Sequence, residues 1–158
     1  MNNRICSAGF YVEKHEFGQN NEYCYWDILG EADTPKSLIP IGGSGRLPDT
    51  PEQILIKKFC EKTEAMPEEY KEVYRETQGG VLKCYFLITK VSGHTPCIEP
   101  IRLFDRSYVY INKLQIDGFV KVLPERYRKP IYYTLEEFAK SDAVFKEKYQ
   151  TLIDNLKS

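Results

Sequence analysis

Runs of aromatic and β-branched residues at the start of the chain predict two strands. Such runs are found at residues 4–13 and 22–29. The segment between them contains glycine and asparagine, and two strand-like runs joined by such residues predict a β-hairpin. Cys24, Trp26 and Ile28 occupy alternate positions of the second run, so we expect these three side chains to face the core. The N-terminal hairpin is therefore expected over residues 4–29.

The segment 30–49 lacks a periodic apolar pattern. It contains three of the nine prolines and four of the ten glycines of the chain. Glycine and proline are the residues that most strongly interrupt regular structure. A connection of this length inside a domain is usually mobile or functional. We therefore expect a mobile loop over 30–49, in which the short apolar run 38–41 is the candidate for an edge strand.

A helix is predicted to begin at Thr50. Thr50 and Gln53 have the spacing of a capping box, and Pro51 stands at the first helical position, where proline is favoured. Apolar residues then recur at helical spacing at Ile54, Leu55 and Phe59. The capping residues and the apolar stripe together predict that the first helix packs against the core.

A second helix is predicted to begin at Pro67, because proline interrupts the first helix and can start the next one. Tyr70, Val73 and Tyr74 have the i, i+3, i+4 spacing of one apolar helix face. Two glycines at positions 79–80 are typical of a helix end. We therefore expect two helices over residues 50–78.

The second half of the chain predicts a sheet followed by a helix. Residues 81–123 carry several runs of strand composition, and Asp117-Gly118 is typical of a hairpin turn. A capping box formed by Thr134 and Glu137 predicts a C-terminal helix over 134–156, which could divide at 141–142. These elements predict a single α+β domain, with a mostly antiparallel sheet and two or three helices packed on one face.

Composition and charge exclude some classes of protein. The chain has 158 residues, of which 42% are hydrophobic, and its formal net charge is −1. This balance favours a folded domain over a disordered chain and lacks the basic excess of a dedicated nucleic-acid binder. No apolar run has the length of a membrane helix, and the first residues lack the apolar region of a secretory signal. We expect a cytoplasmic protein without membrane contact, whose five cysteines are mostly buried, reduced thiols.

Few residue combinations in the sequence indicate catalysis or metal binding. Histidine occurs only at positions 15 and 94. His94, Cys97 and Cys84 would supply three metal ligands, whereas structural zinc normally uses four with paired CxxC spacing, which is absent. We therefore expect no metal and no cofactor. A small enzyme whose site includes His94 and Cys97, near the glycine-rich segment, remains an alternative.

The glycine-rich run 41–46 could bind an anion through its backbone amides, with Arg46 adding positive charge. It lacks the lysine of a phosphate-binding P-loop and does not directly precede the helix. A flexible, exposed loop is the ordinary explanation of such a run.

Basic and aromatic side chains gather in the second half of the chain. The candidate binding residues there are Tyr108, Tyr110, Arg126, Tyr127 and Arg128, to which we add Arg46. Tyrosine and arginine are enriched at the energetic centres of protein interfaces, and the same mixture suits single-stranded nucleic acid. The near-neutral net charge favours a protein partner, and nucleic acid remains the alternative.

One segment resembles a known family. The helix-like run 54–74, with Met66-Pro67 inside it and Gln78-Gly79-Gly80 after it, resembles the helix pair of the SUKH superfamily. Cys60 stands where that family usually has glutamate. The resemblance covers residues 54–80 and implies an immunity or adaptor protein without catalytic residues. Mainly because the sequence shows no convincing catalytic set, we expect a non-catalytic protein-binding module of the inhibitor, immunity or adaptor type.

Overall fold

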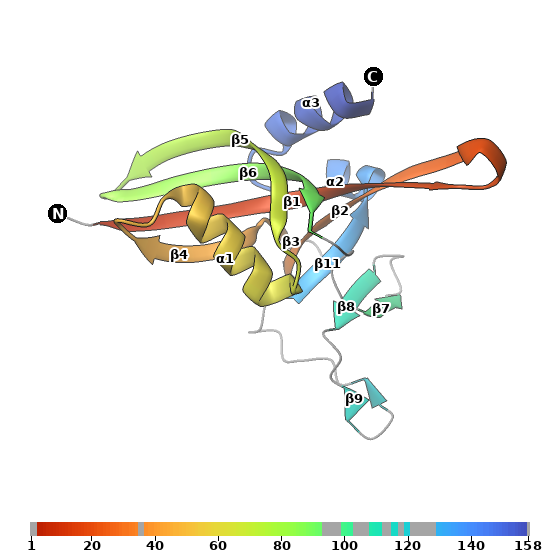
Figure 1. Cartoon of the computed structure of the whole chain (residues 1–158), viewed down its shortest axis with the longest axis horizontal. Coiled ribbons are helices and arrows are strands. Elements are labelled where there is room, and N and C mark those ends of the chain that lie inside the picture. The colour runs from red at the N-terminus through yellow and green to blue at the C-terminus, as the bar shows by residue number, and fades with distance from the viewer. Residues whose placement is uncertain are drawn as a thin grey trace.

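The chain folds into a strongly twisted sheet with helices on both sides (Figure 1). The computed structural model describes residues 3–34, 37–92, 99–102, 108–111, 115–116, 119–120 and 129–157. The strands are β1 (Arg4–Phe17), β2 (Tyr23–Thr34), β3 (Ser37–Ile39), β4 (Ile41–Arg46), β5 (Pro67–Gln78), β6 (Val81–Val91), β7 (Glu99–Arg102), β8 (Tyr108–Ile111), β9 (Gln115–Ile116), β10 (Phe119–Val120) and β11 (Lys129–Thr134). The helices are α1 (Pro51–Thr63), α2 (Leu135–Lys140) and α3 (Lys146–Lys157).

The main sheet of the described residues has nine strands. Seven follow the order β5-β6-β1-β2-β11-β8-β7, while β4 pairs with β1 and β3 pairs with β2. Every neighbouring pair is antiparallel except β1 and β6, which run parallel. β9 and β10 form a separate antiparallel pair, and the predicted hairpin turn at 117–118 lies outside the described residues. The expected α+β class with a mostly antiparallel sheet is confirmed.

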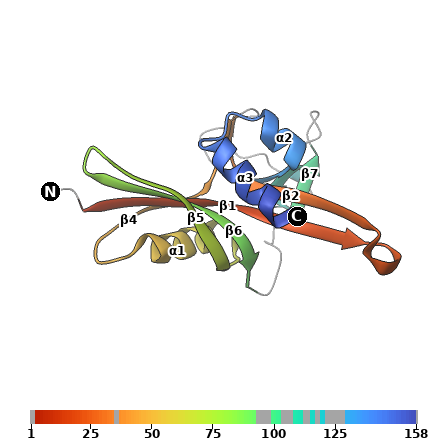
Figure 2. The same ribbon diagram turned by 90° about the horizontal axis from the view of Figure 1, so that it is seen from above.

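Helices cover both faces of the sheet, and the prediction that they share one face is wrong. Figure 2 shows α1 on one side of β1 and β6, with α2 and α3 on the other. On the α1 side, Leu55 and Phe59 are buried in a cluster with sheet residues that include Phe86. On the other side, Phe138 and Tyr149 are buried against the sheet, with Phe10 at the centre of the contact.

The two-sided packing has a simple cause in the sequence. Phe10, Tyr11 and Val12 are consecutive in β1, and all three are buried, with Tyr11 facing the α1 side and the other two facing α2 and α3. In β6, Phe86, Leu87 and Ile88 repeat the pattern. A strand that is apolar at consecutive positions must be covered on both faces, so a single helical layer would leave half of these side chains in water.

The segment 67–78, which was expected to be a helix, is the edge strand β5, paired with β6 along its whole length. The strand pairing is irregular between Glu72 and Tyr74, so Tyr70 and Tyr74, which strict alternation would place on one face, lie on opposite faces. Tyr70 packs on Phe86 at the α1 side, whereas Tyr74 stacks against Phe145 at the α3 side. The second of the two helices expected over residues 50–78 is therefore absent.

The expected mobile loop at 30–49 is also wrong, because most of this segment belongs to β2, β3 and β4. The glycines of β4 have a packing role. A Cβ atom at Gly45 would lie 2.8 Å from the Ile54 side chain, and one at Gly43 would lie 2.8 Å from Lys58. The absence of side chains here lets α1 lie directly on the strand. The glycine-rich run therefore serves helix–sheet contact rather than forming an exposed loop.

Both predicted capping boxes are confirmed. The Thr50 hydroxyl accepts a hydrogen bond from the Gln53 amide at 3.2 Å, and the Thr50 amide donates to the Gln53 side chain at 2.8 Å. Thr134 and Glu137 make the same pair of bonds at the start of α2. The expected C-terminal helix divides into α2 and α3 at Ser141, close to the position that the sequence indicated.

Candidate functional site

The structure places the predicted binding residues in separate parts of the fold or outside its described residues. Arg46 is the exposed last residue of β4, which pairs with β1. Tyr108 and Tyr110 belong to β8, on the far side of β11, where Tyr108 pairs with Tyr132. Residues Arg126, Tyr127, Arg128, His94 and Cys97 lie outside the described part of the chain. The structure therefore does not bring Arg46 together with the two tyrosines of β8.

The clearest projecting feature is the arm, defined here as residues 13–27, which comprises the end of β1, the 3₁₀ turn Gln19–Asn21 and the start of β2. β6 pairs with β1 only as far as Tyr11, and β11 pairs with β2 only from Asp27 onward. Beyond these points, β1 and β2 are each other's only strand neighbours among the described residues, and the turn of the ribbon that they form projects from the molecule (Figures 1 and 2).

One face of the arm, the tyrosine face, carries aromatic and titratable side chains. Its members are Glu13, His15, Tyr23, Tyr25 and Asp27, which strand alternation places on the same side of the ribbon. The His15 and Tyr25 rings are stacked, with centroids 4.5 Å apart and an interplanar angle of 13°. His15 Nε2 lies 3.2 Å from Asp27 Oδ2 and 3.7 Å from Glu13 Oε2. The ring of His15 thus lies on a tyrosine and beside two carboxylates.

The carboxylates of this face are only partly hydrated. Burial raises the pKa of Asp27, and the nearby carboxylates of Glu13 and Glu137 raise it further, while His15 opposes them. Glu13 accepts a long hydrogen bond of 3.5 Å from the hydroxyl of Tyr132. Burial, with Glu13 adding to it, also raises the pKa of Tyr11 well above its ordinary value. The base of the arm therefore concentrates negative charge in a partly dry environment.

The opposite face of the arm contacts the body, which is the main sheet with its helices. Trp26 is half-buried and packs against the core cluster beneath α2 and α3. Lys14 lies 5.7 Å from the centre of the Trp26 ring and forms an ion pair of 2.6 Å with Glu16. Of the three residues expected to face the core, Ile28 is buried, Trp26 is half-buried and Cys24 is exposed.

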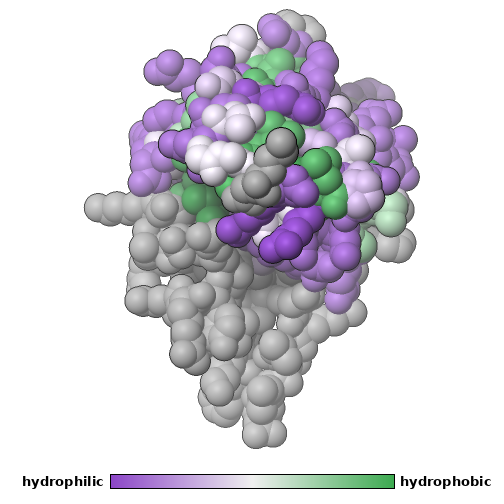
Figure 3. All heavy atoms as spheres, turned by 90° about the vertical axis from the view of Figure 1, so that its left-hand side faces the viewer, coloured by the Kyte–Doolittle hydropathy of each residue, from purple (hydrophilic) through white to green (hydrophobic). Residues whose placement is uncertain are grey.

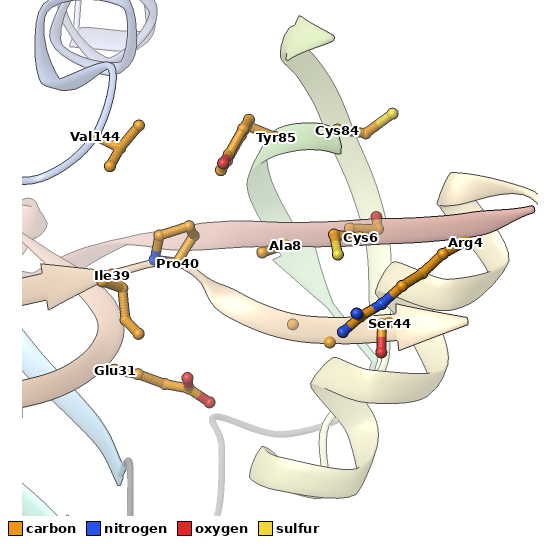
Figure 4. Close-up of a pocket in the computed structure, with 13 residues that line it drawn as sticks. Arg4, Cys6, Ala8, Glu31, Ile39, Pro40, Ser44, Cys84, Tyr85 and Val144 are labelled. Carbon is orange, nitrogen blue, oxygen red and sulfur yellow. The ribbon is translucent and has the colours of Figure 1, made fainter. Parts of the chain in front are cut away.

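A cavity of about 360 Å³ lies between β4, β1, β6 and the segment that joins α2 to α3. Figure 4 shows Cys6 and Ala8 projecting from β1, Tyr85 from β6 and Val144 from the joining segment. Burial raises the pKa of Tyr85, and Glu76 and Cys6 add to this effect. None of the described residues that line the cavity is a histidine.

At one end of the cavity, Glu31 is held by α1 (Figure 4 shows Glu31). Lys62 Nζ lies 2.7 Å from a Glu31 carboxylate oxygen and donates a hydrogen bond of 2.6 Å to the carbonyl of Gly42. Sequence reasoning did not identify Glu31, Lys62, Glu13 or Asp27 as site residues, because in the sequence each resembles an ordinary polar surface residue. It noted His15 only as one of two histidines.

Among the described residues, no three histidine, cysteine, aspartate or glutamate side chains converge as the ligands of a metal ion would. None of the described helices is both long enough and apolar enough to span a membrane. At the end of the molecule shown in Figure 3, hydrophilic residues dominate the described surface, and hydrophobic residues form only small groups. That end therefore presents no extended apolar surface in its described part.

The fold and the arm define an α+β protein with a projecting aromatic ribbon. Comparison with models of known protein families finds no match. No curated protein matches the chain either.

Proposed function

We propose that the protein is a non-catalytic protein-binding module that contacts its partner through the arm. The observation that carries this proposal is the exposure of two tyrosines on a two-stranded projection: Tyr23 is 57% exposed and Tyr25 is 47% exposed. Tyrosine offers a large, rigid contact area with a polar tip, and it is enriched at the energetic centres of interfaces. Two such rings on one face supply the anchor that a partner surface would cover.

The shape of the arm supports the same proposal. A two-stranded hairpin is only marginally stable in water unless something packs against it. The body covers the Trp26 side of the arm, whereas the two exposed tyrosines lie on the other side. A partner that packs on the tyrosine face would stabilise the ribbon and bury these rings. We also propose that the protein is cytoplasmic and acts as an inhibitor, immunity or adaptor protein.

The test compares partner retention by two forms of the tagged protein, recovered gently from its own cells and measured by native mass spectrometry. We expect a polypeptide at fixed stoichiometry with the wild-type chain, and its loss with the double variant Tyr23→Ala/Tyr25→Ala. Leu47→Ala is the matched control, because Leu47 is also exposed and apolar but lies directly after β4, outside the arm. Equal retention by the double variant, or an oligonucleotide in place of a polypeptide, would overturn the proposal.

A further inference from the structure

The strand β5 leaves a long edge of the main sheet unpaired. It has 12 residues and pairs with β6 alone, so it is the longest of the described strands that has a single neighbour. Figure 1 shows β5 along the upper margin of the sheet. Of its residues, only Pro67 is buried. An unpaired edge presents a row of backbone N–H and C=O groups with which another strand can pair, so β5 is a site for the addition of a strand.

The irregularity between Glu72 and Tyr74 exchanges the two faces of β5 along the strand. Before it, even-numbered residues face α1, because Tyr70 packs on Phe86 at that side. After it, even-numbered residues face α3, because Tyr74 packs on Phe145. The α1 side therefore carries Tyr70, Glu72, Arg75 and Thr77, and the α3 side carries Lys71, Val73, Tyr74, Glu76 and Gln78.

This exchange of faces lets β5 pair with β5 of a second copy in a symmetric antiparallel register. Directly opposed side chains of an antiparallel pair must lie on the same face. A two-fold axis between Val73 and Tyr74 opposes each of them to the other residue in the second copy, and both lie on the α3 side. In a strand without the irregularity, the same axis would oppose side chains on different faces.

The opposed charges in this register have opposite signs. Moving outward from the axis, Glu72 lies opposite Arg75 of the second copy on the α1 side, and Lys71 lies opposite Glu76 on the α3 side. Two-fold symmetry makes each of these pairs occur twice. A shift of the axis by one residue in either direction loses both pairs, and in one of these directions it opposes Glu69 to Glu76. Charge complementarity therefore selects a single register.

The outer of the two charge pairs is available for contact between copies. Among the described residues, Lys71 and Glu76 form no ion pair, and Glu76 accepts only a long hydrogen bond of 3.4 Å from the Tyr74 hydroxyl. Arg75 already pairs with Glu72 at 2.6 Å and with Glu52 at 3.6 Å within one chain. Charged side chains on an edge strand usually prevent association with other strands. Here they oppose an arbitrary strand and favour a second copy of β5.

We propose that β5 pairs with β5 of a second copy of this chain, so that the two main sheets continue into each other across a two-fold axis. The homodimer is closed, because the same strand forms the contact on both copies. The proposal goes beyond the binding role of the arm and is independent of it, since residues 13–27 lie outside β5. In Figure 1 the turn of the arm and the turn that joins β5 to β6 lie at opposite ends of the molecule.

The test measures the mass of the full-length chain in solution, by size-exclusion chromatography with light scattering over a dilution series. We expect a dimer at high concentration that dissociates on dilution, with a dissociation constant in the micromolar range. Lys71→Glu and Glu76→Lys should each weaken the dimer by roughly tenfold or more, because two favourable pairs become repulsive. Lys140→Glu, the same change of charge on the exposed surface of α2, should leave the dimer unchanged.

A mixture of the two variants tests the register itself. In equal amounts, Lys71→Glu and Glu76→Lys should form a mixed dimer with an affinity close to that of the wild type, because acidic residues of one chain then oppose lysines of the other at both positions. Native mass spectrometry identifies the mixed dimer when one variant carries a heavy isotope. Circular dichroism and thermal unfolding establish that each variant is folded.

A wild-type chain that stays monomeric at millimolar concentration would overturn the proposal. A dimer that tolerates Lys71→Glu, or a mixture of the two variants that forms no mixed dimer, would show that copies do not meet through β5 in this register. These outcomes leave the role of the arm untouched, because Tyr23→Ala/Tyr25→Ala lies outside β5 and tests retention of a different polypeptide.

Discussion

An ion pair between Lys62 and Glu31 joins α1 to β2, beside Gly42 of β4. Their charged groups are 2.7 Å apart, and the same ammonium donates to the carbonyl of Gly42. Glu31 is 1% exposed, whereas Lys62 is 35% exposed. A carboxylate so deeply buried requires a compensating charge, since an uncompensated buried charge is strongly destabilising. Lys62 is therefore a structural residue of α1.

Replacement of Lys62 by methionine is expected to lower the free energy of unfolding by about 2–3 kcal/mol. This is near the lower end of the cost of breaking a buried pair, because Lys62 keeps some contact with water. Urea denaturation measures the change. The control is Lys58→Met on the same helix, where Lys58 pairs with the exposed Glu61 at 3.4 Å, and there we expect less than about 1 kcal/mol. Equal effects would contradict a special role of Lys62.

The glycines of β4 should differ sharply in their tolerance of alanine. A Cβ atom at Gly42 would overlap the backbone carbonyl of Ser7, which cannot move aside, whereas one at Gly43 would meet only the flexible side chain of Lys58. We expect Gly42→Ala to cost about 3 kcal/mol or to prevent folding, and Gly43→Ala to cost less than about 1 kcal/mol. Thermal unfolding checks both variants. A tolerant Gly42 would show that β1 and β4 are less tightly joined than described.

Asp27 is expected to make the folded state less stable as pH rises, whereas carboxylates usually have the opposite effect. Burial raises its pKa in the folded state, so its protonated form is preferentially folded. The stability that Asp27 contributes through this raised pKa is fully present below its unfolded-state pKa of about 4. That stability is lost as pH rises through its folded-state pKa. Asp27→Asn cannot ionise. Its stability relative to the wild type should therefore increase from pH 4 upward, as urea denaturation at several pH values would show. A difference that stays constant or decreases would contradict the shift.

The hydroxyl of Tyr149 is expected to contribute little stability. It is fully buried and has no hydrogen-bond partner among the described residues, and burial raises its pKa well above the ordinary value. Tyr149→Phe should leave the free energy of unfolding unchanged or raise it by about 1 kcal/mol, because it removes an unpaired polar group. Tyr149→Leu should instead cost roughly 2 kcal/mol, since its ring packs against Phe10 and Phe138. A loss of more than about 1 kcal/mol in Tyr149→Phe would reveal a partner for the hydroxyl.

Capping boxes predicted two helix starts correctly, whereas the helix start predicted at Pro67 is wrong. The capping boxes at Thr50 and Thr134 are correct because each depends on residues only three positions apart. The strand β5 was missed because its identity depends on pairing with β6 and on a pairing irregularity between Glu72 and Tyr74. Propensity over 67–78 favours a helix, and the tertiary context overrides it.

The candidate site was harder still to predict. Glu13 and Asp27 are 14 positions apart in sequence and are brought opposite each other by the hairpin register. The hairpin itself was predicted, but its first strand was expected to end at residue 13, which left His15 in the turn. In the structure this strand continues to Phe17, and His15 lies opposite Tyr25. Glu31 and Lys62 carried no such signal, because they meet only through the packing of α1 on the sheet.

The central position of β1 has a consequence for the order in which the chain folds. During synthesis, β1 emerges first and can pair with β2 as soon as the hairpin is complete. Its other edge must wait for β6, since Ile5 pairs with Leu82 far along the chain. Contacts between such distant residues form late, because the intervening chain must first be ordered. Until then, one edge of β1 is open, and the nascent chain is most exposed to misassociation during this interval.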